Sequence, residues 1–203
     1  MSAAPEGSPG RSAAAAGVDN GSWLVLIDLQ RIFGEPGSDW FTPRFAEAAA
    51  GAARLRPAFG QRVALTRFLA PEKPAGAWIP YYQDWPFALD PANRALYDLV
   101  PEIPPLDARL IDRPTFGKWS AETRAALDDP REIVLAGVST DCCVISTALA
   151  AADDGVRVRV VADACAGLSD ADHRRALDVM ALYAPLISIT SVDEILAERA
   201  AAG

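Results

Sequence analysis

Three side chains in this sequence combine nucleophilic, acidic and cationic chemistry, and each lies beside a short apolar run. Cys143 stands in GVSTDCCV, Asp28 in WLVLIDLQ and Lys118 in FGKWS. A thiolate attacks carbonyl carbons readily, and a nearby carboxylate can take the thiol proton. An ammonium group beside both would stabilise their anionic forms. The three residue types therefore indicate hydrolysis through a covalent intermediate, provided that the fold brings them together.

The adjacent cysteines, Cys142 and Cys143, follow residues that can begin a helix. Ser139, Thr140 or Asp141 can cap it, so that one cysteine falls in the first turn. Backbone N–H groups and the helix dipole there would lower the pKa of the thiol and could hold an oxyanion. The alternative is that both cysteines are small buried side chains that pack the helix onto a sheet. We prefer this alternative for Cys142 and leave both interpretations open for Cys143.

Asp28 and Lys118 also have ordinary structural interpretations. An aspartate at a strand end can cap a loop, although an ionised carboxylate after five apolar residues needs partners. A lysine is usually a solvated surface charge. Only two of the 19 basic residues are lysines, however, and Lys118 is flanked by Phe116 and Trp119. These features favour a functional role for Lys118.

Composition restricts the class of protein. A net charge of −8 argues against a nucleic-acid-binding surface, and no run of 18 apolar residues predicts a membrane span. Three cysteines, two of them neighbours, form no disulfide framework, so we expect a cytoplasmic protein. Residues 1–21 are expected to be a disordered tail and residues 22–203 a single domain. The single histidine, His173, is expected at the surface of an amphipathic helix.

Short apolar runs alternate with helical patterns along the domain. Strands are predicted at 23–29, 62–68, 109–112, 132–137, 156–162 and 186–191, and helices at 43–59, 92–99, 120–127, 140–154, 170–183 and 192–201, with a long aromatic-rich loop over 69–91. This alternation predicts an α/β fold with three αβα layers and a doubly wound six-stranded parallel sheet in the order 3-2-1-4-5-6. Strands one and four would then be neighbours at the switch point, where ligands bind.

Three segments resemble the isochorismatase-like cysteine hydrolase superfamily, which includes nicotinamidases, N-carbamoylsarcosine amidases and ureidoacrylate hydrolases. They are LIDLQRIF (26–33), FGKWS (116–120) and GVSTDCCVISTALAAADDGVRVRVVADAC (137–165). The resemblance implies a catalytic triad of Asp28, Lys118 and Cys143, because the nucleophile of that family precedes a valine. It also implies a cis peptide bond between Val138 and Ser139, with the backbone N–H groups of Ser139 and Cys143 directed at an oxyanion.

The sequence also departs from parts of that superfamily. Nicotinamidases carry an aspartate and histidine cluster for a metal after the second strand, whereas residues 66–90 of this chain contain no histidine. We therefore expect no metal and no cofactor, and nicotinamidase activity is disfavoured. Isochorismatases proper cleave a vinyl ether without the cysteine, so Cys143 argues against that reaction as well.

Aromatic side chains provide candidates for a substrate pocket, namely Phe33, Phe68, Trp78, Trp85 and Trp119. A subunit interface or a small core beneath the long loop explains the aromatic loop equally well. The resemblance implies a homodimer or homotetramer.

The expected function is cleavage of a C–N bond of amide type in a small molecule, through a thioester on Cys143. A lactam, a ureido or carbamoyl group, or an ester are alternatives for the same three side chains. A dinucleotide oxidoreductase is disfavoured, because no Gly-x-Gly-x-x-Gly follows the first strand. A binding protein without catalytic activity is the alternative from another class, and the sequence does not identify the substrate.

Overall fold

A six-stranded parallel sheet forms the centre of the computed structural model, which describes residues 21–202. Its strands are β1 (Trp23–Ile27), β2 (Val63–Phe68), β3 (Arg109–Arg113), β4 (Glu132–Val138), β5 (Arg157–Ala166) and β6 (Ile187–Thr190). They lie in the order β3-β2-β1-β4-β5-β6, which confirms the predicted topology. The predicted N-terminal tail lies almost wholly outside the described residues.

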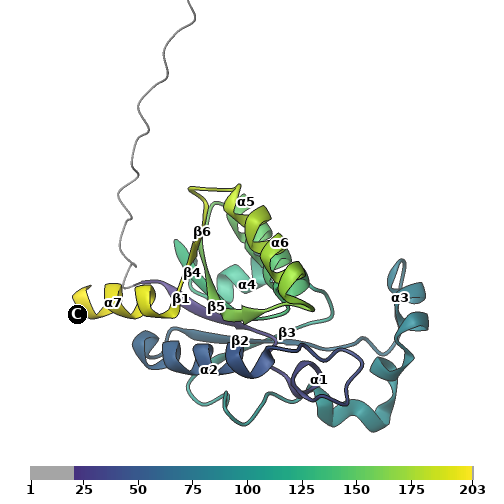
Figure 1. Cartoon of the computed structure of the whole chain (residues 1–203). Helices are drawn as coiled ribbons and strands as arrows, with labels where there is room; N and C mark the ends of the chain where they lie inside the picture. The colour runs from purple at the N-terminus through teal and green to yellow at the C-terminus, as the bar shows by residue number, and fades with distance from the viewer. Residues whose placement is uncertain (1–20, 203) are drawn as a thin grey trace, which may run out of the picture.

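Helices cover both faces of this sheet (Figure 1). The α-helices are α1 (Arg31–Gly34), α2 (Phe45–Leu55), α3 (Trp78–Asp84), α4 (Ala121–Ala126), α5 (Ile145–Asp153), α6 (Asp170–Ala181) and α7 (Val192–Ala202). The 3-10 helices are η1 (Arg56–Phe59), η2 (Pro86–Leu89) and η3 (Pro91–Tyr97), and η4 (Thr140–Val144) is a π-helical turn. α2 and α7 pack on one face, and α5 and α6 pack on the other (Figure 1). The three predicted layers are therefore present.

β1 shows why the strands are continuous apolar runs. All five of its residues are buried, because alternate side chains point into two different cores. Leu24 and Leu26 join the core beneath α2 and α7. Val25 and Ile27 join the core beneath α5 and α6.

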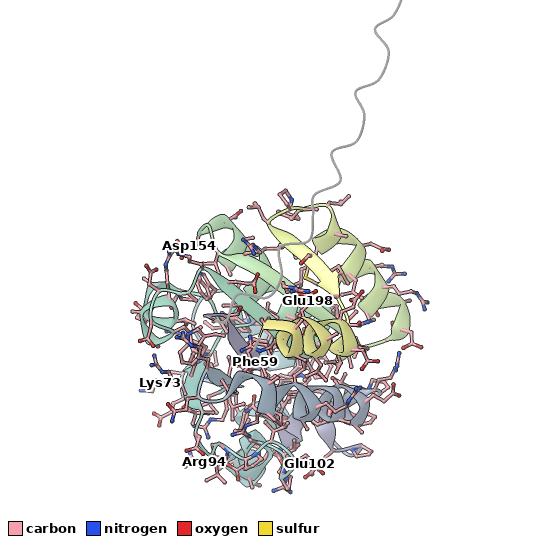
Figure 2. All side chains as sticks on the ribbon, turned by 90° about the vertical axis from the view of Figure 1, so that its left-hand side faces the viewer. Phe59, Lys73, Arg94, Glu102, Asp154 and Glu198 are labelled. Carbon is pink, nitrogen blue, oxygen red and sulfur yellow. The ribbon has the colours of Figure 1, made fainter. Side chains whose placement is uncertain are left out.

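α7 is held by polar contacts as well as by apolar packing. The Arg159 guanidinium on β5 forms an ion pair with the Glu198 carboxylate at 2.5 Å. The Arg199 guanidinium lies 4.0 Å from the centre of the Phe59 ring. Figure 2 shows this end of the molecule, with Phe59 and Glu198 next to α7. Within residues 21–202, no helix has the length and apolar character needed to span a membrane.

The segment predicted as a loop over 69–91 contains two helical turns, α3 and η2. Pro80 lies in the first turn of α3, where a proline is tolerated, and aromatic neighbours stabilise this short helix. The Trp78 ring lies 5.2 Å from the Tyr81 ring and 6.0 Å from the Tyr82 ring. Residues 140–144 also differ from the prediction, because they form a π-helical turn before the α-helix begins.

Gly137 allows β4 to approach β1 closely at the predicted switch point. It pairs with Ile27, and its φ of +119° is in a region that side chains disfavour. A Cβ atom on Gly137 would lie 2.1 Å from the carbonyl oxygen of Ile27. A side chain at this position would therefore separate the two strands.

We predict that Gly137→Ala destabilises the fold by at least about 3 kcal/mol, because steric overlap adds to an unfavourable φ. Gly37→Ala is the matched control, since a Cβ atom there meets nothing within 4 Å. Thermal unfolding of both variants measures the difference. Equal melting temperatures for the two variants would show that the close approach of β1 and β4 is not required.

Candidate active site

A buried ion pair joins the ends of two segments that are 90 residues apart in the sequence. The Lys118 ammonium lies 2.9 Å from Oδ2 of Asp28, and both side chains are fully buried. This contact lacks the alignment of a hydrogen bond, so it is an ion pair only. The expectation that a lysine is usually solvated does not hold for Lys118. The structure thus brings together two of the three predicted triad residues.

Each member of the ion pair has further partners. The Thr66 hydroxyl donates a hydrogen bond of 2.6 Å to Oδ1 of Asp28. The Lys118 ammonium donates a hydrogen bond of 2.6 Å to the carbonyl of Thr115 and lies 5.0 Å from the centre of the Phe68 ring. Buried charges need hydrogen bonds and opposite charges to replace their contacts with water, and these neighbours provide them for Asp28 and Lys118.

The chain turns sharply at Asp28, immediately after β1. Its φ of +50° is in the left-handed region, which aspartate tolerates better than most residues. The side chain of Gln30 holds the next turn through hydrogen bonds to both backbone groups of Phe68 and to the carbonyl of Tyr97. The sequence prediction missed Gln30. An amide side chain directly after an apolar strand could have indicated hydrogen bonds of this kind.

Cys143 lies in the π-helical turn that follows β4, and its side chain is 3% exposed. A single hydroxyl connects its backbone to that of the lysine. Oγ1 of Thr147 donates a hydrogen bond of 2.6 Å to the carbonyl of Cys143 and accepts one of 3.0 Å from the N–H of Lys118. The cysteine turn and the lysine loop are therefore fixed relative to each other.

The pKa of the Cys143 thiol is raised well above its usual value, opposite to the direction expected for the first turn of a helix. Burial is the largest cause, and the negative charge of Asp28 is the next. The positive charge of Lys118 opposes this rise in the pKa of the thiol. The resting side chain is therefore a thiol at neutral pH, close to a carboxylate that can accept its proton.

The backbone before Cys143 has the special geometry that the sequence resemblance implied. The peptide bond between Val138 and Ser139 is cis. The carbonyl of Ser139 accepts hydrogen bonds from the N–H groups of Cys142 and Val144, at 3.2 and 3.0 Å. The turn thus closes around Ser139, directly beside the thiol.

A cavity of about 380 Å³ opens beside Cys143. Three of the five residues predicted to contact substrate line it, namely Phe33, Phe68 and Trp85. Trp78 is not in its lining but packs behind it, with its ring 5.1 Å from that of Phe116. Trp119 is on a different surface, where its indole N–H donates a hydrogen bond of 2.9 Å to Asp154.

Tyr81, from the aromatic loop considered as a possible pocket wall, also lines the cavity. The sequence prediction missed several other residues of the wall, namely Asp39, Trp40, Thr42, Phe116, Asp141 and Leu168. Trp40 is central among them, since its ring lies 6.0 Å from that of Phe33 and 5.6 Å from that of Phe68. Its indole N–H is buried without an acceptor among residues 21–202. Asp141 fixes the rim, because it accepts hydrogen bonds from the Ser139 hydroxyl and from the N–H of Leu168.

Residues 22–191 match the isochorismatase domain family. The chain belongs to this family. A relative in Xenopus laevis, isochorismatase domain-containing protein 2, is 38% identical over 90 residues, which are 43% of this chain and 44% of the relative. The matched segment is thus less than half of that relative.

Two solved structures share the fold of this chain. A cysteine hydrolase from Pseudomonas syringae pv. phaseolicola 1448A has a TM-score of 0.82 at 17% identity, covering 93% of this chain and 97% of that chain. PnC1 from L. infantum in complex with nicotinate has a TM-score of 0.70 at 15% identity, covering 88% and 97%. At these identities the similarity concerns the fold alone.

Within residues 21–202 of this isochorismatase domain, no group of three or more His, Cys, Asp or Glu side chains could hold a metal ion. The prediction of a site without a metal stays a prediction from the sequence.

The single histidine of the isochorismatase domain is not the surface residue that its helix pattern predicted. His173 on α6 is half-buried, and its Nδ1 lies 2.8 Å from the hydroxyl of Thr140 at the start of the cysteine turn. Burial lowers the pKa of His173, as does the charge of Arg44, while Asp170 and Asp141 oppose this. Amphipathic periodicity could not reveal this contact, because the cysteine turn is 33 residues away in sequence.

We predict that the fold loses stability as the pH falls below about 6.5, the usual pKa of histidine. The folded state holds His173 with a lowered pKa, so the unfolded chain binds more protons in this range. The contribution of neutral His173 to the free energy of unfolding is complete above pH 6.5 and is lost on acidification. The measurement is the free energy of unfolding of the wild type and of His173→Gln between pH 7.5 and 5. A variant with the same pH slope as the wild type would contradict the assignment to His173.

Proposed function

We propose that this isochorismatase domain hydrolyses a C–N bond of amide type in a small molecule, through a thioester on Cys143. The observation that carries the proposal is the thiol beside a buried carboxylate and ammonium at the wall of an apolar cavity. Asp28 is the base, Cys143 the nucleophile and Lys118 the cation that pairs with the Asp28 carboxylate.

The first half of the reaction forms the acyl-enzyme. The sulfur of Cys143 adds to the carbonyl carbon while its proton moves to Asp28. The backbone N–H groups of Ser139 and Cys143 stabilise the negative oxygen of the tetrahedral intermediate. The C–N bond then breaks, the nitrogen takes the proton from Asp28, and ammonia or an amine leaves.

The second half regenerates the thiol. Water adds to the thioester carbon and transfers one proton to Asp28. The C–S bond breaks, the sulfur takes that proton back, and the carboxylic acid leaves. Each proton is returned, so the chain's own residues suffice for the proton transfers.

The cavity supports a small substrate, since its volume suits a compact molecule and aromatic rings line it. PnC1 of L. infantum, which shares the fold, was solved with nicotinate, a small ring compound with one carboxylate. The net charge of −8 does not favour a nucleic acid as substrate.

We predict that Cys143→Ala lowers kcat by at least about 10³-fold without loss of the fold, because the proposed thioester forms on this sulfur. Cys165→Ala is the matched control, as this cysteine is also buried but does not line the cavity. The assay measures ammonia and acid release from a panel of amides, lactams, carbamoyl compounds and esters. Near-normal turnover by Cys143→Ala would exclude the mechanism.

We predict that Asp28→Asn has opposite effects on alkylation and on hydrolysis. Without the carboxylate, the charge of Lys118 alone acts on the thiol, so the pKa of Cys143 falls. Iodoacetamide should then modify Cys143 faster at pH 7.5, because a larger fraction is thiolate. Hydrolysis should decrease by about 10²- to 10⁴-fold, because the general base is absent.

Peptide mapping by mass spectrometry measures the alkylation of Cys143, and circular dichroism confirms that the variant is folded. Asp178→Asn, on an exposed part of α6, is the control for loss of one carboxylate. Asp28→Asn with unchanged turnover would refute the role of Asp28 as base.

A further inference from the structure

The cavity beside Cys143 is lined by aromatic rings, which come from segments far apart in the sequence. They are Phe33, Trp40, Phe68, Tyr81, Trp85 and Phe116. Trp40 contacts four of the others, with ring centres 5.6 to 6.3 Å apart. The faces of such rings carry negative charge density and attract cations, most strongly when water is excluded.

The ionisable side chains of the lining give the cavity a negative potential. Asp39 and Asp141 are its carboxylates, and no lysine, arginine or histidine is among the lining residues. Burial raises the pKa of Tyr81, Cys142 and Cys143, so these groups are uncharged at neutral pH. An anionic ligand would therefore meet two carboxylates and no cation in the wall of the cavity.

Two basic side chains outside the lining are paired with carboxylates of the protein. Lys118 faces Asp28 in the buried ion pair. Arg44 forms ion pairs at the surface with Glu47 and, at 3.5 Å, with Asp170. Neither of them lines the cavity.

We propose that the cavity selects amides whose acyl group carries a permanent or protonated positive charge, and that it rejects amides bearing a carboxylate. The aromatic rings bind the cation by their faces, and Asp39 and Asp141 balance its charge. This inference rests on the proposed amide hydrolysis and adds the charge class of the substrate.

The test uses three 3-substituted benzamides that differ mainly in charge. 3-(Trimethylammonio)benzamide is cationic, 3-tert-butylbenzamide is its neutral analogue of the same shape, and 3-carboxybenzamide is anionic. We expect kcat/KM for ammonia release to be at least tenfold higher for the cation than for the tert-butyl compound. The anion should be at least tenfold poorer than the neutral compound. Equal values for cation and neutral compound, or a preference for the anion, would overturn the proposal.

Asp39→Asn tests the contribution of the lining carboxylates. Asp39 is exposed and has no part in the proposed proton transfers. The ratio of kcat/KM between cation and neutral compound should fall about fivefold in Asp39→Asn and stay unchanged in Asp178→Asn. If the kcat/KM ratio between cation and neutral compound stayed unchanged in Asp39→Asn, the proposed role of Asp39 in balancing the charge of the cation would be wrong.

Binding to Cys143→Ala separates failure of this inference from failure of the proposed function. Calorimetric titration with the trimethylammonium and tert-butyl compounds measures charge preference without turnover. Tighter binding of the cation with no hydrolysis by the wild type would refute the proposed function and keep the charge selection. Hydrolysis of all three compounds without charge preference would refute the charge selection and keep the proposed function.

Discussion

The ion pair between Asp28 and Lys118 is the constraint on which the site depends. Moving two charges out of water costs several kcal/mol for each ion, and their attraction offsets this only with good geometry and further partners. Here the partners come from adjoining segments: Thr66 and Phe68 from β2, and Thr115 from the loop after β3. The carboxyl ends of β1, β2 and β3 must therefore meet at one place, as the order of strands allows.

In the proposed mechanism, the same ion pair lets a buried cysteine be uncharged at rest and still act as the nucleophile. Lys118 is already matched by Asp28, so ionising Cys143 would add an unbalanced negative charge to a dry site. Moving the thiol proton onto Asp28 changes no net charge, since the thiolate then faces the ammonium. The proposed mechanism therefore uses proton transfer during attack rather than a thiolate that exists beforehand. Thr147 fixes the backbone of Cys143 relative to that of Lys118, which pairs with Asp28.

The sequence predicted the sheet because it depends on local apolar patterns, whereas the triad of Asp28, Lys118 and Cys143 came from the resemblance to a known superfamily. Each strand is an apolar run, and Asp28, Lys118 and Cys143 each follow or adjoin a strand end. Trp40 could not be predicted this way, since it lies between α1 and α2 and meets its partners only through tertiary packing. Trp119 shows the converse, because its position beside Lys118 implied a pocket but its ring turns to Asp154. Sequence neighbours of a site residue need not share its cavity.

Exclusion of water links the aromatic wall to the chemistry of the thiol. Phe116, one ring of the cavity wall, packs against the core cluster that contains Cys143, and burial is the largest cause of the raised pKa of this thiol. The same low dielectric strengthens hydrogen bonds to any oxyanion and the attraction between Lys118 and a developing thiolate. A more open cavity would ease ionisation of the thiol but weaken both of these interactions. In the proposed mechanism, the buried carboxylate of Asp28 resolves this conflict, because ionisation of the thiol and attack then occur in one step.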